Sequence, residues 1–162
     1  MLEQRPYTPQ ELLAWCRLTG LTLVGLALAY VREREGGIDG FIDYAAARLG
    51  ETWGAMGTPG VEASTLLLQL SAEALGGDVH SRAMTAEEGE IVISDLPGDG
   101  QPEALEDRFD MTVTVDDILG VAGVSREEMN RLYDVLGGIV TGAGYAYARE
   151  PEGSEQRLTV RA

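Results

Sequence analysis

The first third of the chain consists mainly of long apolar stretches with the punctuation typical of helices. The run Thr8-Pro9-Gln10-Glu11 predicts a helix start, because Thr8 can cap the first turn and Glu11 can bond back to the backbone of the cap. Gly36-Gly37 predicts its end. The apolar residues fall on every side of this helix, so we expect its own domain or a partner to bury it all round. They include Leu12, Trp15, Cys16, Leu18, Leu23, Leu26 and Tyr30.

Two further helices are expected next. One covers Ile38 to Met56, where apolar residues recur at helical spacing until Gly57. The other covers Val61 to Leu75, after the cap-plus-proline pair Thr58-Pro59 and before Gly76-Gly77. Three helices are therefore expected to open the chain.

Beyond these helices the apolar period changes to that of strands. Val79 to Thr85 and Glu90 to Asp95 flank Glu87-Glu88-Gly89, which predicts a β-hairpin with a glycine-containing turn. Phe109 to Val115 alternates apolar and polar residues, as a half-buried antiparallel strand does. Three strands are therefore expected in this part of the chain.

Two helices and a second hairpin complete the chain. The helices are expected at Asp116 to Gly123 and at Ser125 to about Thr141, the second opened by the capping-box spacing of a serine and a glutamate. The hairpin is expected at Tyr145 to Arg149 and Gln156 to Arg161, around Pro151-Glu152-Gly153.

Together these elements predict a single α+β domain over residues 1–162. Residues 1–77 form its mainly helical part, and residues 78–162 form a part made of hairpin, strand, helices and hairpin. We expect an antiparallel sheet of about five strands that packs one face against the helices, because the strands mostly alternate apolar and polar positions.

The composition adds a strong negative charge to this picture. Of the 162 residues, 27 are acidic and 12 are basic, every basic residue is arginine, and the formal net charge is -15. Such a field repels nucleic-acid phosphates and anionic membrane surfaces. Nucleic acid is therefore not expected as a partner, and we predict no salt-sensitive affinity for duplex DNA.

The apolar N-terminal segment is interpreted as a core helix. Its longest uncharged run, Leu18 to Val31, is shorter than the about 20 residues that a membrane span needs. The residues before Tyr7 lack the pattern of a secretory signal. Cys16 is the only cysteine, so no intramolecular disulfide can form. We therefore expect a cytoplasmic protein without a membrane span.

Two features of the sequence raise the question of a metal or catalytic site: a lone cysteine with a lone histidine, and an acidic loop. Cys16 and the lone His80 cannot assemble a zinc site, and a cysteine within an apolar helix usually acts as a small buried hydrophobe. The loop Asp95 to Glu106 has the acidic spacing of a calcium loop, but Pro97 and Pro102 interrupt the pattern. We expect no metal and no cofactor, and no effect of calcium on thermal stability.

The segment Thr114 to Leu132 resembles a helix-turn-helix motif. Gly123 falls at the turn of the motif, although Leu119 stands where the family usually has a small residue. Glu127 and Glu128 open the helix that would read DNA, which disfavours binding to phosphates. A packed helix pair is expected, and a transcription regulator is the alternative. The residues at the packing positions are Ile118, Ala122, Val124, Met129 and Leu132.

A longer resemblance spans residues 38 to 162. Ala47-Arg48-Leu49-Gly50 lies in a helix, Gly137-Gly138 with Gly142 precedes the last hairpin, and Gly153 lies at its tip. With the order of elements, this resembles vinyl-reductase-type and aminothiazoline-carboxylate-hydrolase-like small-molecule domains. The resemblance implies a small ligand and, as a further alternative, a hydrolase; no catalytic residue can be carried over. The glycines themselves indicate close helix packing.

We therefore expect a non-catalytic domain that binds a small, partly apolar ligand between helices and sheet. Arg82 is the candidate polar anchor, since an arginine beside a pocket can fix the orientation of a ligand. The candidate ligand-binding residues are Tyr30, Trp53, His80, Arg82, Tyr145 and Tyr147.

The first helix also predicts a homodimer. Gly20, Val24, Ala27 and Val31 form a slim stripe at helical spacing that would let a second helix approach. Symmetric dimers are the commonest oligomers, so a second copy is the expected partner.

Overall fold

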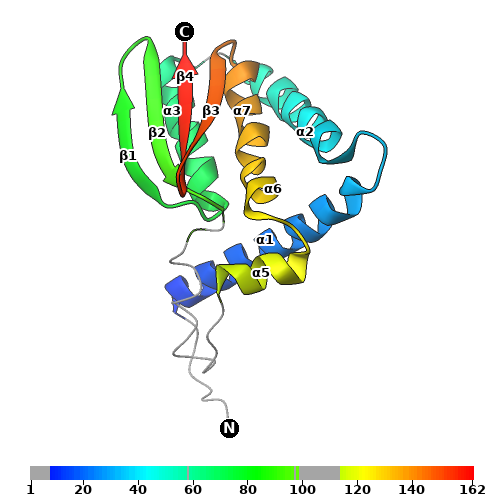
Figure 1. Ribbon diagram of the computed structural model, residues 1–162. Helices are drawn as coiled ribbons and strands as arrows, with labels where there is room; N and C mark the ends of the chain where they lie inside the picture. The colour runs from blue at the N-terminus through cyan, green and yellow to red at the C-terminus, as the bar shows by residue number, and fades with distance from the viewer. Residues whose placement is uncertain (1–7, 58, 97, 99–113) are drawn as a thin grey trace.

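The computed structural model describes residues 8–57, 59–96, 98 and 114–162. Within them the chain is α+β, with one antiparallel sheet of four strands and helices against one of its faces (Figure 1). The helices are α1 (Pro9–Arg32), α2 (Gly37–Gly54), α3 (Val61–Ala74), α5 (Val115–Ala122), α6 (Arg126–Asn130) and α7 (Leu132–Gly142). The strands are β1 (Val79–Met84), β2 (Glu88–Ser94), β3 (Ala146–Glu152) and β4 (Glu155–Arg161).

Helix starts follow the caps that the sequence indicates. At the start of α1, the Thr8 backbone N–H donates to Glu11 Oε2 at 2.7 Å and the Glu11 N–H donates to Thr8 Oγ1 at 3.1 Å. Ser125 and Glu128 form the same reciprocal cap at α6. Each of these caps gives a hydrogen-bond acceptor to two backbone N–H groups that would otherwise be unpaired at the start of the helix.

Two helix boundaries differ from the expectation. The third helix begins after Gly60, which caps α3 without a side-chain bond, and Thr58 lies outside the described residues. The long helix expected from Ser125 is interrupted at Arg131, which ends α6 and precedes α7. Arg131 turns its side chain to Asp134 and to Asp39 of α2, so a tertiary contact accompanies the break.

The sheet has the strand order β1-β2-β4-β3, with every neighbouring pair antiparallel. The first hairpin turns at residues 85–87, and Gly89 lies inside β2 rather than in the turn as expected. A β-carbon at Gly89 would lie 2.0 Å from Thr65 Oγ1 of α3. Glycine is therefore needed there for the close approach of strand and helix.

The fifth expected strand is not confirmed. Its residues up to Val113 lie outside the described part of the chain. Its last two residues do not continue a strand, because Thr114 caps α5 and Val115 begins it. The Thr114 hydroxyl and backbone N–H both donate to Asp117, a capping box that the alternating pattern concealed.

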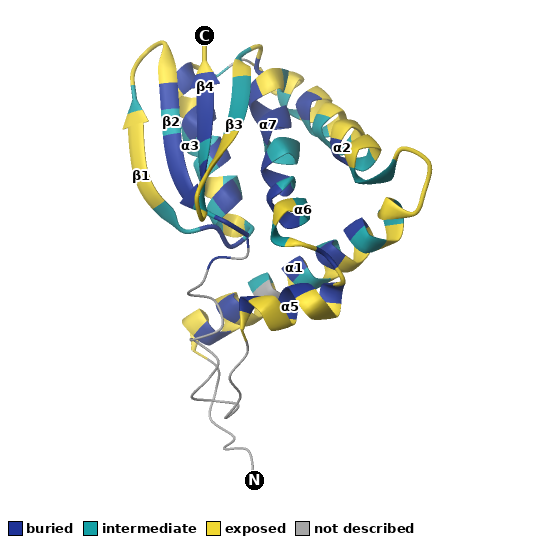
Figure 2. Cartoon of the chain, in the orientation of Figure 1, coloured by how far each residue is buried: buried dark blue, intermediate teal, exposed yellow. Residues whose placement is uncertain are grey.

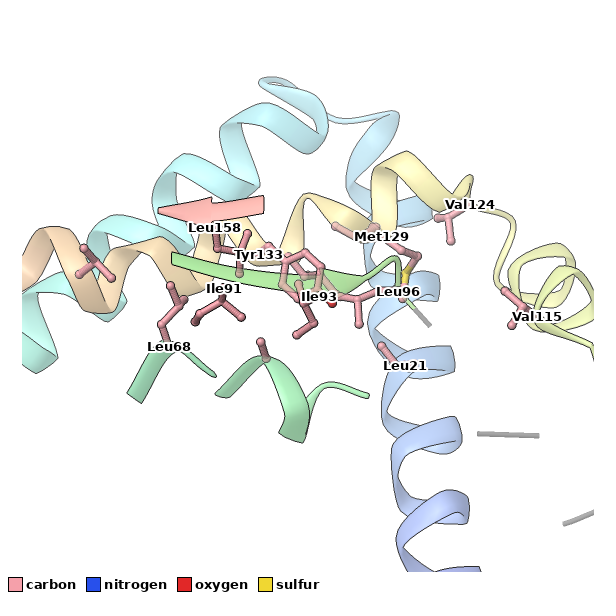
Figure 3. Packing of buried hydrophobic residues seen from close by; sticks show 14 of the residues in the cluster. Leu21, Leu68, Ile91, Ile93, Leu96, Val115, Val124, Met129, Tyr133 and Leu158 are labelled. Atoms are coloured by element: carbon pink, nitrogen blue, oxygen red, sulfur yellow. The ribbon is translucent and has the colours of Figure 1, made fainter. Parts of the chain in front are cut away.

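The core lies between the sheet and helices α3 and α7 (Figure 3). Ile91 and Ile93 of β2 and Leu158 of β4 point to this side, where Leu68 of α3 and Tyr133 of α7 are fully buried. One face of the sheet therefore packs against α3 and α7. The opposite face carries cross-strand ion pairs, among them the pairs of Arg157 with Glu90 and of Arg161 with Glu88.

Helices α2 and α7 approach each other through glycines, as the glycine run indicates. A β-carbon at Gly142 would lie 2.2 Å from the Gly50 carbonyl oxygen, and one at Gly138 would lie 2.3 Å from the Ala46 carbonyl oxygen. Any side chain at these positions would separate the two backbones. The partner helix was not predictable from the run itself.

Helix α1 lies at the lower edge of the molecule, beside α5 (Figure 1). Ala122 of α5 packs against Gly25, and Leu21 and Leu28 point into the core. The helix is not buried all round as expected, since much of its surface is exposed (Figure 2). By length and composition alone it could cross a membrane, a test that core helices of soluble proteins also pass.

Candidate functional site

The two aromatic residues expected from the first helices lie on different elements. Tyr30 is exposed on α1, where the Arg34 guanidinium lies 4.3 Å from the centre of its ring. Trp53 is half-buried near the end of α2. Neither residue lines the grooves described below.

The two candidate polar residues lie on the edge strand β1. His80 Nδ1 contacts Glu155 of β4, and both side chains are partly exposed. Arg82 donates to Gln69 Oε1 of α3 at 2.9 Å. Arg82 therefore ties the edge strand to a helix and is not among the residues that line the two grooves described below.

The last two candidate residues take part in the core. Tyr147 packs its ring over Gly137 and donates its hydroxyl proton to the Tyr133 carbonyl oxygen at 2.8 Å. Tyr145 is half-buried against the hydrophobic cluster. Burial raises the pKa of Tyr147 and of Tyr133 above their ordinary value, so both hydroxyls stay neutral donors. The six expected residues do not form one site.

The helix-turn-helix-like segment folds into two short helices joined at Gly123, of which α5 lies against α1 and α6 against α7. Gly123 adopts the left-handed conformation at the turn. The helix that would read DNA, α6, has 5 residues. Its acidic residues bind within the chain, since Glu128 pairs with Arg32 at 2.8 Å and Glu127 with Arg149 at 3.0 Å. These ion pairs connect the first turn of α6 to α1 and to β3.

A buried polar cluster joins the end of β2 to α6 and β4. Asp95 Oδ1 accepts hydrogen bonds from Asn130 Nδ2 at 2.8 Å and from Gln156 Nε2 at 2.7 Å. Asn130 Oδ1 accepts from the Leu96 backbone N–H at 2.7 Å. Asp95 thus has a structural role, and the remainder of the calcium-like loop, apart from Leu96 and Gly98, lies outside the described residues.

Arg149 extends this cluster along β3. It donates to Gln156, to Asp134 of α7 and to Glu127 of α6. Burial alone would lower the pKa of Arg149, but its hydrogen bonds to the Asp134 and Glu127 carboxylates raise it. The buried cation is therefore fully paired, as a structural cation must be.

A polar hollow of about 270 Å³ opens where the α1–α2 turn meets α6. Its two arginines are already paired, Arg32 with Glu128 and Arg131 with Asp39 and Asp134. It offers no unpaired cation to an anionic ligand. No group of three metal-binding side chains occurs among the residues that the structure places.

A second groove, between α1 and the end of α3, has a different character. It has a volume of about 240 Å³ and walls that are almost entirely apolar. Arg17 is the one charged residue in its wall. We call it the α1–α3 groove; it is lined by Leu13, Cys16, Arg17, Gly20, Leu21, Val24, Ala74 and Leu75.

Arg17 stands apart from the other arginines of the described ranges. Within the part of the chain that the structure describes, its Nε is buried and has no hydrogen-bond partner. A buried donor without an acceptor costs about 1–3 kcal/mol. An arginine is thus held at an apolar groove with one donor unsatisfied.

The sequence could have indicated Arg17 by one signal only. It is the single charge between Glu11 and Arg32 in a long apolar helix. The sequence does not show which segment lies beside Arg17. The groove around Arg17 also needs Ala74 and Leu75, at the end of α3, which line its other side.

No protein-family model, no curated protein and no solved structure matches this chain.

Proposed function

We propose that this domain is a non-catalytic binding module for a small, mostly apolar molecule that carries one anionic group. The ligand lies in the α1–α3 groove with its apolar body on the leucine and valine walls. Its anionic group accepts hydrogen bonds from Arg17. The observation that carries this proposal is that Arg17, the one charged residue lining an otherwise apolar groove, has a buried Nε without a hydrogen-bond partner among the described residues.

The energetics favour such a ligand over other classes. A hydrogen bond between a guanidinium and a carboxylate contributes about 1.5–3 kcal/mol, and here it would also satisfy a donor that is otherwise unpaired. The apolar walls add about 25 cal/mol for each Å² that the ligand buries. A polyanion would meet the field of a chain with net charge -15, so a single negative charge is preferred.

The size of the groove limits the ligand. Its 240 Å³ lies below the about 300–1,000 Å³ typical of drug-sized ligand sites. The groove is also open to solvent, because Cys16 and Gly20 on its rim are exposed. A medium-chain fatty acid such as decanoate combines the required charge and apolar body, and serves as the probe.

Calorimetric titration with decanoate tests the proposal. Native protein should bind decanoate, and Arg17→Met should bind it at least about 10-fold more weakly, because a lost charged hydrogen bond is worth about 1.4 kcal/mol or more. Decanol, with a similar chain and no charge, should bind both proteins weakly. Arg48→Met is the matched control, since Arg48 is exposed and pairs with Glu51 on α2. Equal affinity of native and Arg17→Met for decanoate would contradict the proposal.

The unliganded protein gives a second readout. Arg17→Met keeps the long apolar stem and removes the unsatisfied donor, so it should raise the free energy of unfolding by about 1 kcal/mol. Urea denaturation without ligand measures this change. A loss of stability would show that the guanidinium already has a stabilising role in the unliganded fold.

A further inference from the structure

Helix α1 carries an apolar seam on the side that faces solvent. Its positions follow one another at steps of four and three residues, which is the repeat of helices that pack side by side. The seam consists of Leu12, Cys16, Thr19, Leu23, Leu26 and Tyr30, and every one of these residues is exposed.

The exposure of the seam is large for apolar side chains. Leu23 and Tyr30 are 62% and 63% exposed, and Trp15 beside the seam is 51% exposed. The buried positions of the same helix, such as Leu21 and Leu28, lie on the opposite side. No charged residue belongs to the seam.

We propose that the seam is the dimer interface of this protein and that its partner is α1 of a second copy. The seam carries no charge, so two copies of net charge -15 can meet there without bringing like charges into contact. The apolar positions recur at the same spacing along the whole seam, so the seams of two copies can pack against each other. A two-fold symmetric interface needs such a match, because both copies contribute the same surface.

The area of the seam is that of a small dimer interface. Half-exposed Trp15 and Tyr30 offer about 100 Å² each, and half-exposed leucines offer roughly 80 Å² each. With Leu12, Leu23 and Leu26 the exposed apolar area comes to roughly 440 Å² per copy before smaller residues are added. A standard interface takes about 600–1,000 Å² from each partner.

This interface lies on a different side of α1 from the stripe that the sequence indicates. Val24 of that stripe packs against the core, and Gly20 and Val24 line the α1–α3 groove. A charge at Val24 would therefore disturb the fold itself. A charge at Leu23 projects into solvent in one copy and breaks only a contact between copies.

Light scattering on Leu23→Glu and on native protein tests the dimer. Native protein should have twice the 17.4 kDa of one chain, and Leu23→Glu should fall to that of one chain while its circular dichroism shows the native fold. Leu70→Glu is the control, because Leu70 is 61% exposed on α3, away from the seam. That variant should stay dimeric. A monomeric native protein would overturn the proposal, including a monomer that binds neutral phospholipid vesicles through α1.

Labelling of Cys16 locates the interface. Cys16 is the only thiol in the chain and lies within the seam. A thiol reagent should label native protein at least 10-fold more slowly than Leu23→Glu, because pairing of the seams covers the sulfur. A native dimer whose Cys16 reacts as fast as that of Leu23→Glu would place the interface elsewhere and overturn the assignment.

Discussion

At the scale of single residues, the fold depends on glycines that let backbones touch. Gly142→Ala should destabilise the protein by about 2–4 kcal/mol, because its β-carbon would meet the Gly50 carbonyl oxygen of α2. Gly40→Ala in the same α2 should stabilise it by about 0.5–1 kcal/mol, because nothing lies near that position. Thermal denaturation of both variants measures these opposite signs. Equal effects would mean that the close α2–α7 contact is not formed.

Buried amides give a second prediction at this scale. Asn130→Ala should cost about 2–4 kcal/mol, because the Leu96 N–H loses its acceptor and Asp95 loses a donor inside the core. Asn130→Asp keeps the shape of the side chain and the oxygen that accepts from the Leu96 N–H, but it replaces the donor to Asp95 with a second carboxylate. Both variants should lower the urea midpoint, and an unchanged midpoint for Asn130→Ala would contradict the cluster.

Individual residues were harder to assign from the sequence than the elements that carry them. The expected role of the glycine run was confirmed, because close packing depends on the absence of a side chain. The ligand residues were chosen by type, and the structure distributes them over α1, α2, β1, β3 and the residue before β3. Arg17 was not chosen, since its importance depends on a neighbour from α3 that local sequence does not contain.

At the scale of elements, the capping boxes link stability to pH. Hydrogen bonds from Thr114 lower the pKa of Asp117 below its ordinary 3.8. Burial would raise the pKa of Glu128, but bonds from Ser125 and Arg32 lower it below 4.5. A carboxyl whose pKa is lowered in the native state stabilises the fold at pH values above its ordinary pKa, and this stabilisation is lost as the pH falls through the native pKa.

The free energy of unfolding of native protein should therefore exceed that of Thr114→Ala by the full amount near neutral pH, and the difference should shrink below about pH 4. Urea denaturation at several pH values measures it, and a constant difference would contradict the caps.

The order and type of the described elements could largely be predicted. The spacing of apolar residues, together with glycines and prolines at the ends of elements, predicted the bounds of α1, α2, α3, α5 and both hairpins to within a few residues. The break at Arg131 was missed because no glycine or proline marks it in the sequence; an ion pair of Arg131 with distant Asp39 accompanies it. The turn of the first hairpin was misplaced, because Gly89 serves a contact with Thr65 instead.

At the scale of the whole molecule, the charge governs partners. Duplex DNA should show no salt-sensitive binding, because the net charge is -15 and the acids at the start of α6 already bind Arg32 and Arg149. Fluorescence anisotropy with labelled duplex at low and physiological salt checks this. Specific binding that survives physiological salt would restore the transcription-regulator interpretation.

The central claim is that Arg17 holds an anionic group in the α1–α3 groove, and its side-chain Nε–H can be observed directly. Proton–nitrogen NMR of ¹⁵N-arginine-labelled protein, with Arg17→Met to assign the signal, follows it during titration with decanoate. We predict a saturable shift of the Arg17 Nε–H signal with decanoate and none with decanol. A saturable shift of another arginine, such as Arg82, with the Arg17 signal unmoved would contradict the claim.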